Sequence, residues 1–236
     1  MPRRSDRQVF VSVEWLADHL ADDNLRIIDA RYAYPNEVLQ GEEMYANGHI
    51  PGAVFVHWRN DLSVNTPPVP NLLLGREAFA DKMGQLGVDA DTTVVVYDLG
   101  NVIWAARIWW ALRYYGHDRV YVLDGGAAAW QAAGGACTTA VEQPPAKTFV
   151  AGLRPHMRAS RAQVRAAIDD PHSLIIETRR AASLQEGGGT VKSAFWLPST
   201  TVFAPQETYQ TLIAEAELDA YLAAIGADQA PHLVAT

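Results

Sequence analysis

The stretch that decides the fold is residues 93–113, TVVVYDLGNVIWAARIWWALR. Residues 94–97 form a short, almost wholly apolar run rich in β-branched side chains, which is typical of a strand buried on both faces. Residues 98–101 interrupt the run with turn formers, and from Trp104 to about Tyr115 apolar residues return at helical spacing. The stretch therefore predicts a buried strand, a tight loop and a helix.

The predicted loop at residues 98–101 is where this fold would place its chemistry. In open α/β sheets, ligands bind beyond the carboxyl ends of the strands. The backbone N–H groups of such a loop and of the first helical turn can also cradle an anion. The loop sequence is DLGN, without cysteine, serine, histidine or lysine. We therefore expect an anion cradle at this position that lacks a thiol or hydroxyl nucleophile.

The composition limits the class of protein. With 236 residues, of which 49% are hydrophobic and 19% charged, the chain should be globular and has room for one large or two small domains. The net charge of −8 argues against sequence-independent binding of nucleic acid. One cysteine, Cys137, allows no disulfide framework or cysteine zinc cluster. No apolar run approaches the roughly 20 residues of a membrane span. We expect a cytoplasmic protein. We also expect it to need no metal and no cofactor.

The first half of the chain alternates predicted strands with predicted helices. Buried strands are predicted at residues 25–31, 54–56, 94–97 and 120–123. Helices are predicted at residues 77–86, 104–115 and 127–133. The polar segment 34–47 is expected to be a turn-rich excursion, and the proline-containing segment 65–70 to be irregular. This alternation predicts an α/β domain with a parallel sheet whose faces are covered by helices.

The second half repeats the first. Ser160, Ile175 and Arg179 follow one another at the same spacing as Ser12, Ile27 and Arg31. Residues 189–194 parallel residues 48–53, and residues 233–236 parallel residues 94–97. A repeat of this length indicates two copies of one domain. We therefore predict a first domain at residues 8–137, a linker at 138–157 and a second, incomplete domain at 158–236.

The ordered motifs of the first half resemble the rhodanese superfamily in its tandem form, the thiosulfate and 3-mercaptopyruvate sulfurtransferases. The matching motifs are IDAR at 28–31, GHIPGA at 48–53, VYD at 96–98, AAR at 105–107 and VLDGG at 122–126. The match is weaker after Ser160, where GTVKSA stands in place of GHIPGA. The resemblance implies tandem rhodanese-like domains, each a parallel sheet flanked by helices, with the second domain truncated.

The resemblance also implies a function. Members of this family move a sulfane sulfur from thiosulfate or 3-mercaptopyruvate to cyanide or a thiol through a cysteine persulfide. Their first domain is usually silent and often carries an aspartate where the second carries the cysteine, which Asp98 fits. We therefore expect the catalytic cysteine just after Thr236, and no turnover by the 236 residues alone. Arg179 is expected to bind the anionic sulfur donor, because a guanidinium matches such an anion.

Three other residues or pairs invite a catalytic interpretation. Cys137 follows a predicted helix and glycines, without a cradle, and is interpreted as incidental. His49 lies in the GHIPG turn and is expected to serve that turn by hydrogen bonding. Asp29 and Arg31 are expected to form an ion pair that steadies the loops of the silent domain.

Two other functions stay open at this point. Asp98 after an apolar strand also resembles the nucleophile of haloacid-dehalogenase phosphatases, but that chemistry needs a second aspartate where this chain has Gly100. Phosphatases built on the rhodanese fold need a cysteine-to-arginine loop, which the sequence lacks. The second alternative is a rhodanese-like binding or regulatory module that is intact in fold and silent in chemistry.

Overall fold

The chain forms two compact units. The computed structural model describes residues 9–33, 40–67, 69–186, 189–227 and 229–235. Unit 1 comprises Met1–Arg154 with Glu207–Gln210, and unit 2 comprises Pro155–Gln206 with Thr211–Thr236. The boundary after Arg154 falls inside the segment that the sequence indicates as a linker. Residue 8, where the first predicted domain begins, and Thr236 lie outside the described residues.

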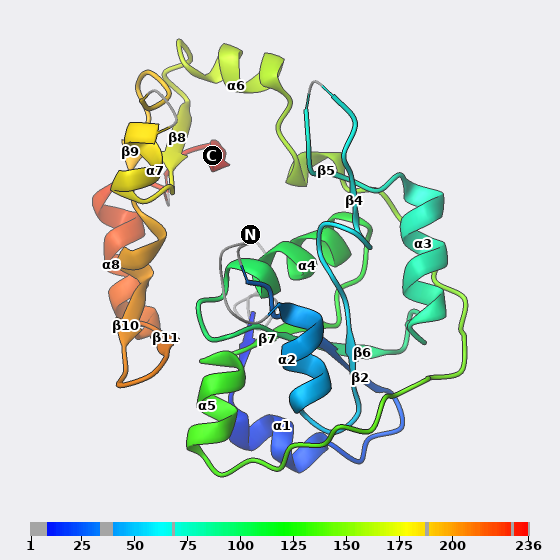
Figure 1. Ribbon diagram of the computed structural model, residues 1–236. Coiled ribbons are helices and arrows are strands. Elements are labelled where there is room, and N and C mark those ends of the chain that lie inside the picture. The colour runs from blue at the N-terminus through cyan, green and yellow to red at the C-terminus, as the bar shows by residue number, and fades with distance from the viewer. Residues whose placement is uncertain (1–8, 34–39, 68, 187–188, 228, 236) are drawn as a thin grey trace. The chain divides into compact units, whose positions relative to one another are not determined.

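Unit 1 is built on a parallel five-stranded sheet in the order β1-β7-β6-β2-β3 (Figure 1). Its strands are β1 (Phe10–Val11), β2 (Leu25–Asp29), β3 (Ala53–Phe55), β6 (Thr93–Tyr97) and β7 (Val120–Leu123). The middle strand β6 pairs in parallel with β2 on one side and with β7 on the other. The prediction that residues 94–97 form an interior strand is confirmed.

Helices cover both faces of this sheet, as the sequence predicts. They are α1 (Val13–His19), α2 (Gly41–Asn47), α3 (Arg76–Gln85), α4 (Ile103–Tyr114) and α5 (Gly126–Ala132). Helices α1 and α5 bury Leu16 and Trp130 in one core cluster with Ile27, Val95 and Tyr97. Helix α4 packs against β6 and β7 on the other side of the sheet (Figure 1). Because side chains alternate along a strand, β6 is buried on both faces.

Of the two predicted excursions, the first contains a short helix, whereas the described residues of the second are irregular as predicted. Helix α2 forms within residues 34–47, because Gln40 and Glu43 make a capping box and Tyr45 is buried; residues 34–39 lie outside the described residues. The segment near residues 65–70 connects a small antiparallel pair, β4 (Ser63–Val64) with β5 (Leu72–Leu73). Helix α2 and strands β4 and β5 are too short for the period of their side chains to predict them.

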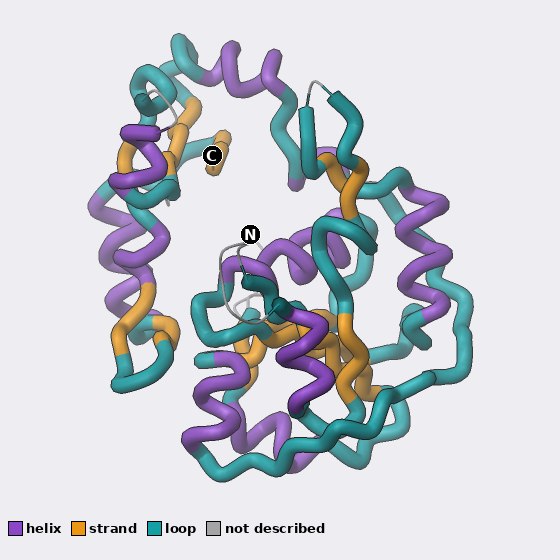
Figure 2. The backbone as a smooth tube through the Cα atoms, in the orientation of Figure 1, coloured by secondary structure: helices purple, strands orange, loops and turns teal. Residues whose placement is uncertain are grey.

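Residues 139–154, which we call the strap, run along unit 1 as an extended loop (Figure 2). The strap is attached by backbone hydrogen bonds: the N–H of Lys147 donates to the carbonyl of Gly84, and that of Gly152 to the carbonyl of Tyr115, each over 2.9 Å. Phe149 is buried, with its ring centroid 5.9 Å from that of Phe79. The strap is therefore part of unit 1.

Gly116 marks the closest approach of the strap to the end of α4. Its φ of +91° lies in the left-handed region, and a Cβ there would lie 2.7 Å from the carbonyl oxygen of Gly152. Only glycine combines that backbone conformation with so close a neighbour at low cost. Gly116 therefore allows the strap to pack closely against the end of α4.

Unit 2 contains a parallel three-stranded sheet in the order β12-β8-β9. Its strands are β8 (Ser173–Glu177), β9 (Phe195–Trp196) and β12 (His232–Ala235), and β10 (Phe203–Pro205) pairs with β11 (Gln210–Leu212). Helices α6 (Arg161–Ala167), α7 (Ala181–Glu186) and α8 (Glu215–Ala224) accompany them, with short 3₁₀ turns at Pro155–Met157 and Ser199–Val202.

The described part of unit 2 repeats part of unit 1. β8 lies between β12 and β9 in unit 2, just as β2 lies between β6 and β3 in unit 1. Ser12 caps α1 by accepting from the N–H of Trp15, and Ser160 caps α6 by accepting from the N–H of Gln163, each over 3.2 Å. The internal repeat predicted from the sequence is therefore present in the structure.

Candidate functional site

Asp98 lies in a cradle of backbone N–H groups at the carboxyl end of β6. The residue is buried, with 1% of its surface exposed. Oδ1 accepts from the N–H groups of Gly100 (2.9 Å) and Val102 (3.1 Å), and Oδ2 from those of Trp104 (3.1 Å) and Ala105 (3.2 Å). Burial raises the pKa of Asp98, and the four donors act against that rise. The carboxylate thus occupies the cradle as an internal anion.

The backbone of this loop is wound tightly around the carboxylate. Val102, a β-branched residue, adopts the left-handed conformation with φ of +66°, which costs a non-glycine residue roughly 1–2 kcal/mol. A Cβ on Gly126 would lie 2.6 Å from the carbonyl oxygen of Asp98, so α5 begins in direct contact with the loop. The strained residue persists because Asp98 and α5 fix the loop from two sides.

A buried network lies beside this loop at the end of β2. Arg31 Nη2 donates to Asp29 Oδ2 over 2.6 Å and to the carbonyl of Gly48 over 2.8 Å. The Tyr97 hydroxyl donates to the same Oδ2 over 2.6 Å. Burial by itself would lower the pKa of Arg31, but hydrogen bonds and the negative charge of Asp29 outweigh it and leave the pKa raised. The expected ion pair is present, and it joins β2, β6 and the GHIPG turn.

Unit 2 holds the counterpart of this network. Arg179 Nη2 donates to Glu177 Oε2 over 2.7 Å and to the carbonyl of Gly189 over 3.1 Å. The hydrogen bond to Glu177 raises the pKa of Arg179. The two arginines differ in exposure: the Arg179 side chain is 39% exposed, whereas that of Arg31 is 7% exposed. Arg179 is therefore the one that can also meet a ligand from solution.

This difference in exposure predicts unequal losses when the two carboxylates are neutralised. Asp29→Asn leaves the buried Arg31 charge without its partner, and we expect the free energy of unfolding of unit 1 to fall by about 3–5 kcal/mol. Glu177→Gln should destabilise unit 2 less, because water can solvate Arg179. Hydrogen exchange of the Ile27 and Ile28 amides for the first variant, and of the Ile175 and Ile176 amides for the second, measures the two losses separately.

Equal losses in the two variants would contradict this prediction, because they would show that exposure of the arginine does not matter. The control is Glu77→Gln, which removes a carboxylate that is 79% exposed and paired with Arg76 on the surface. Such a surface pair contributes little, so Glu77→Gln should leave exchange in β2 unchanged.

His49 and Cys137 lie away from the Asp98 cradle. His49 is 2% exposed, with its ring nitrogens 2.7 Å and 3.0 Å from the carbonyl oxygens of Tyr45 and Ala140. Its ring also stacks on that of Tyr45 at 3.7 Å between centroids. His49 thus ties α2, the GHIPG turn and the strap together. Cys137 is an exposed free cysteine that follows α5 and does not end a buried strand.

These features agree with one protein family. Residues 12–133 match the profile of the rhodanese-like domain. They contain the parallel sheet except for β1, and the central strand of this sheet ends in the anion cradle and is followed by a helix. The match covers more than half of the chain. The chain belongs to the rhodanese family. The second unit, with the same strand order and the same ion pair, makes it a tandem rhodanese.

Curated relatives of this rhodanese chain are sulfurtransferases. It is 39% identical over 174 residues to a 3-mercaptopyruvate sulfurtransferase of Escherichia coli (strain K12), covering 73% of this chain and 62% of the relative. It is 33% identical over 200 residues to thiosulfate/3-mercaptopyruvate sulfurtransferase 2 of Arabidopsis thaliana, covering 75% of this chain and 58% of the relative. The chain therefore spans about three fifths of these relatives' length.

A solved rhodanese structure has the same fold. The crystal structure of SseA from Escherichia coli superposes with a TM-score of 0.82 at 36% identity, over 93% of this chain and 84% of that one. This similarity extends beyond residues 12–133 into unit 2. It confirms the predicted fold class, a parallel sheet flanked by helices in tandem domains.

Some residues of the site were not predicted from the sequence. Tyr97 was predicted only as a strand residue, although a phenol in an otherwise aliphatic strand needs a polar partner, and this signal indicates a contact such as Asp29. The described residues contain no group of three histidine, cysteine, aspartate or glutamate side chains arranged to hold a metal ion. Among the described helices, none has both the length and the apolar character of a membrane span.

Proposed function

We propose that the protein is a sulfurtransferase that moves a sulfane sulfur from thiosulfate or 3-mercaptopyruvate to cyanide or a thiol. The observation that carries the proposal is the anion cradle at the end of the central strand, built from the N–H groups that contact Asp98. Such a cradle lowers the pKa of a thiol placed in it and holds a persulfide anion. The relatives named above are sulfurtransferases, which supports the same chemistry.

The proposed reaction needs a cysteine thiolate. The thiolate attacks the outer sulfur of thiosulfate, the S–S bond breaks, and sulfite leaves with the bonding electron pair. Cyanide then attacks the outer sulfur of the persulfide, which yields thiocyanate and returns the thiolate. Asp98 cannot carry sulfur in this way, because water would break any bond between a carboxylate oxygen and a sulfane sulfur. Unit 1 is therefore the silent copy in this proposal.

The proposal places the nucleophile in the cradle of the second unit. β12 is the counterpart of β6, so the counterpart of Asp98 would come after Thr236 in a whole protein, and the proposal requires a cysteine there. Cys137 is not a candidate, because it lies outside both cradle positions. The coding DNA beyond Thr236 tests this requirement directly.

Arg179 is proposed to bind the anionic sulfur donor. Its Nε and Nη2 are held by Glu177, which fixes the plane of the guanidinium. The described residues give its Nη1 no hydrogen-bond partner, and 39% of the side chain is open to solvent. A fixed, partly open guanidinium suits a sulfonate-like or carboxylate group.

The second candidate function is a catalytically silent binding or regulatory module. The observation that favours it is that Asp98 fills the cradle of unit 1 with the protein's own anion. A stop codon directly after Thr236 in the natural gene would favour this module over the enzyme. Location in the cytoplasm and the absence of nucleic-acid and membrane partners remain predictions from composition.

The activity is tested on the protein expressed from its natural gene, with thiosulfate or 3-mercaptopyruvate as donor and cyanide as acceptor. We expect thiocyanate formation with at least one donor. Arg179→Gln should raise the KM for that donor about tenfold, the loss of one charge-assisted contact. The measurement is the initial rate as a function of donor concentration.

Arg180→Gln is the matched control, because it removes the same charge from the neighbouring, exposed residue. It should leave the KM unchanged. An unchanged KM in Arg179→Gln would remove Arg179 from the donor site while leaving the activity itself standing. No thiocyanate with either donor would overturn the sulfurtransferase proposal.

A further inference from the structure

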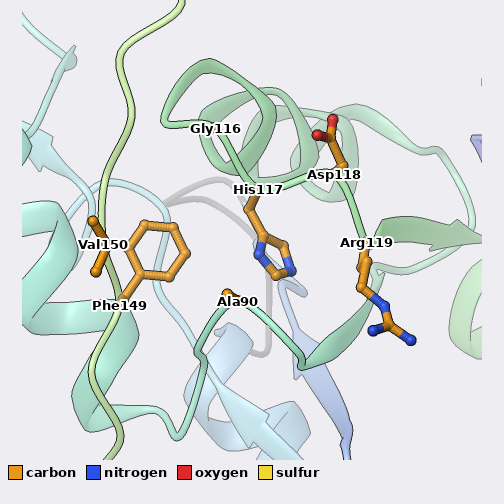
Figure 3. A pocket seen from close by; sticks show the side chains of 7 residues that line it. All are labelled: Ala90, Gly116, His117, Asp118, Arg119, Phe149 and Val150. Carbon is orange, nitrogen blue, oxygen red and sulfur yellow. The ribbon is translucent and has the colours of Figure 1, made fainter.

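Unit 1 has a cavity at the edge of its sheet opposite the Asp98 loop. The cavity has a volume of about 160 Å³ and is lined by Ala90, Gly116, His117, Asp118, Arg119, Phe149 and Val150 (Figure 3). Ala90 leads into β6, and residues 116–119 lead into β7, so the cavity lies where these parallel strands begin. Phe149 and Val150 belong to the strap. None of the cradle residues takes part in it.

His117 is a buried side chain of this cavity with unused hydrogen-bonding capacity. The residue is 5% exposed, and its Nε2 is buried without a hydrogen-bond partner among the described residues. Its ring centroid lies 5.8 Å from that of Phe149, and Figure 3 shows the imidazole between Phe149 and the Arg119 side chain. Buried polar atoms in native proteins nearly always have a partner. The imidazole therefore points to a polar ligand group at this cavity.

The charges around the cavity favour a negative ligand. Asp118 is bound by Arg154, with contacts of 2.7 Å and 2.8 Å, and also by Arg113, so its charge is more than balanced. The guanidinium of Arg119 has no ion pair among the described residues. Burial lowers the pKa of His117, and hydrogen bonding to the backbone of Thr92 and Arg119 acts against that shift. In the tautomer that carries its proton on Nε2, the neutral imidazole has an N–H to donate. In a chain of net charge −8, this is a local excess of positive charge.

The remaining wall of the cavity is apolar. Ala90 presents a methyl group and Phe149 a phenyl ring, whereas the Val150 side chain is mostly exposed to solvent. An inorganic oxyanion would leave some of its oxygens against this hydrocarbon, which is unfavourable. A carboxylate with a short hydrocarbon tail matches both walls. We propose that the cavity binds a small monocarboxylate of the size of propionate or pyruvate, with its carboxylate at Arg119 and His117 and its tail against Phe149.

The proposal is tested with the full chain and propionate, by following the His117 imidazole resonances in ¹H–¹⁵N NMR spectra. We expect a saturable shift with a millimolar dissociation constant, as is usual for so few ligand atoms. Arg119→Gln should weaken binding about tenfold. Because Arg119 is exposed, this variant keeps the fold. Arg76→Gln, which removes a 59% exposed arginine of α3, should bind as the unchanged chain does.

Propionamide is the matched neutral ligand and should cause no saturable shift. Binding of propionamide as tight as that of propionate would overturn the role of charge. Inorganic phosphate that binds more tightly than propionate would replace the proposed ligand class with oxyanions. The absence of a saturable propionate shift, or the same affinity in Arg119→Gln, would overturn the site. The test does not depend on the sulfurtransferase proposal, since it measures no turnover.

Discussion

The 236-residue chain by itself is expected to form no thiocyanate from thiosulfate and cyanide above the uncatalysed rate. Its one cysteine, Cys137, is exposed and follows a helix, so it does not lie in a cradle of N–H groups that could hold a persulfide. The cradle that the chain does contain is filled by Asp98. Losing a catalytic nucleophile can reduce kcat roughly a millionfold, far more than binding residues can restore.

The measurement is a colorimetric thiocyanate assay on three proteins. They are the 236-residue chain, the same chain with Cys137→Ala, and the protein from its natural gene. We expect the first two to match the background and, if a cysteine follows β12, the third to turn over. Turnover by the first that Cys137→Ala abolishes would show that Cys137 is the nucleophile. A signal that survives Cys137→Ala would rule out a thiolate mechanism for this chain.

Asp98→Ala is expected to destabilise unit 1 by about 3–5 kcal/mol, a large share of the 5–15 kcal/mol by which a typical domain is stable. The substitution removes both acceptor oxygens and leaves four N–H groups without their partner in a buried site. It also releases the left-handed backbone at Val102, which the carboxylate helps to hold. The first turn of α4 should fray.

Native-state hydrogen exchange at Val95 and Val96 in β6 measures this loss. Asp98→Asn is the close control, because it keeps one acceptor oxygen and should lose less than Asp98→Ala. Asp81→Ala, which alters an exposed aspartate of α3, should change exchange in β6 very little. If Asp98→Ala loses no more than Asp81→Ala, the cradle does not depend on the carboxylate, and Asp98 is not the internal anion that holds the loop of unit 1.

Short-range patterns were enough to predict the main elements of unit 1. The run of four apolar residues at 94–97, which ends at Asp98, predicts a buried strand. The structure has this strand as β6. The helix predicted from Trp104 to about Tyr115 is α4, Ile103–Tyr114, since apolar spacing and Gly116 define its extent. The anion cradle expected at residues 98–101 was also predictable, because the four N–H groups that contact Asp98 lie within seven residues of it.

Contacts between distant residues were not predictable in this way. Tyr97 meets Asp29 across 68 positions of the sequence, and His49 meets Ala140 across 91. The strap was predicted as a linker because proline-rich sequence without a period indicates no element. The strap is attached to Gly84 and Tyr115 by hydrogen bonds between backbone groups. The types of side chain along the strap do not predict such bonds.

By itself the sequence determined the main strands of unit 1, the α/β class with its parallel sheet, the internal repeat and the family motifs, because each of these can be recognised from the order of residues along the chain. Only the tertiary structure decided that the Arg31 side chain is buried while that of Arg179 is 39% exposed. It also decided that the strap lines a cavity beside His117. The physical reason is that burial and cavity shape depend on which separate elements pack together. No local pattern of side chains carries that information.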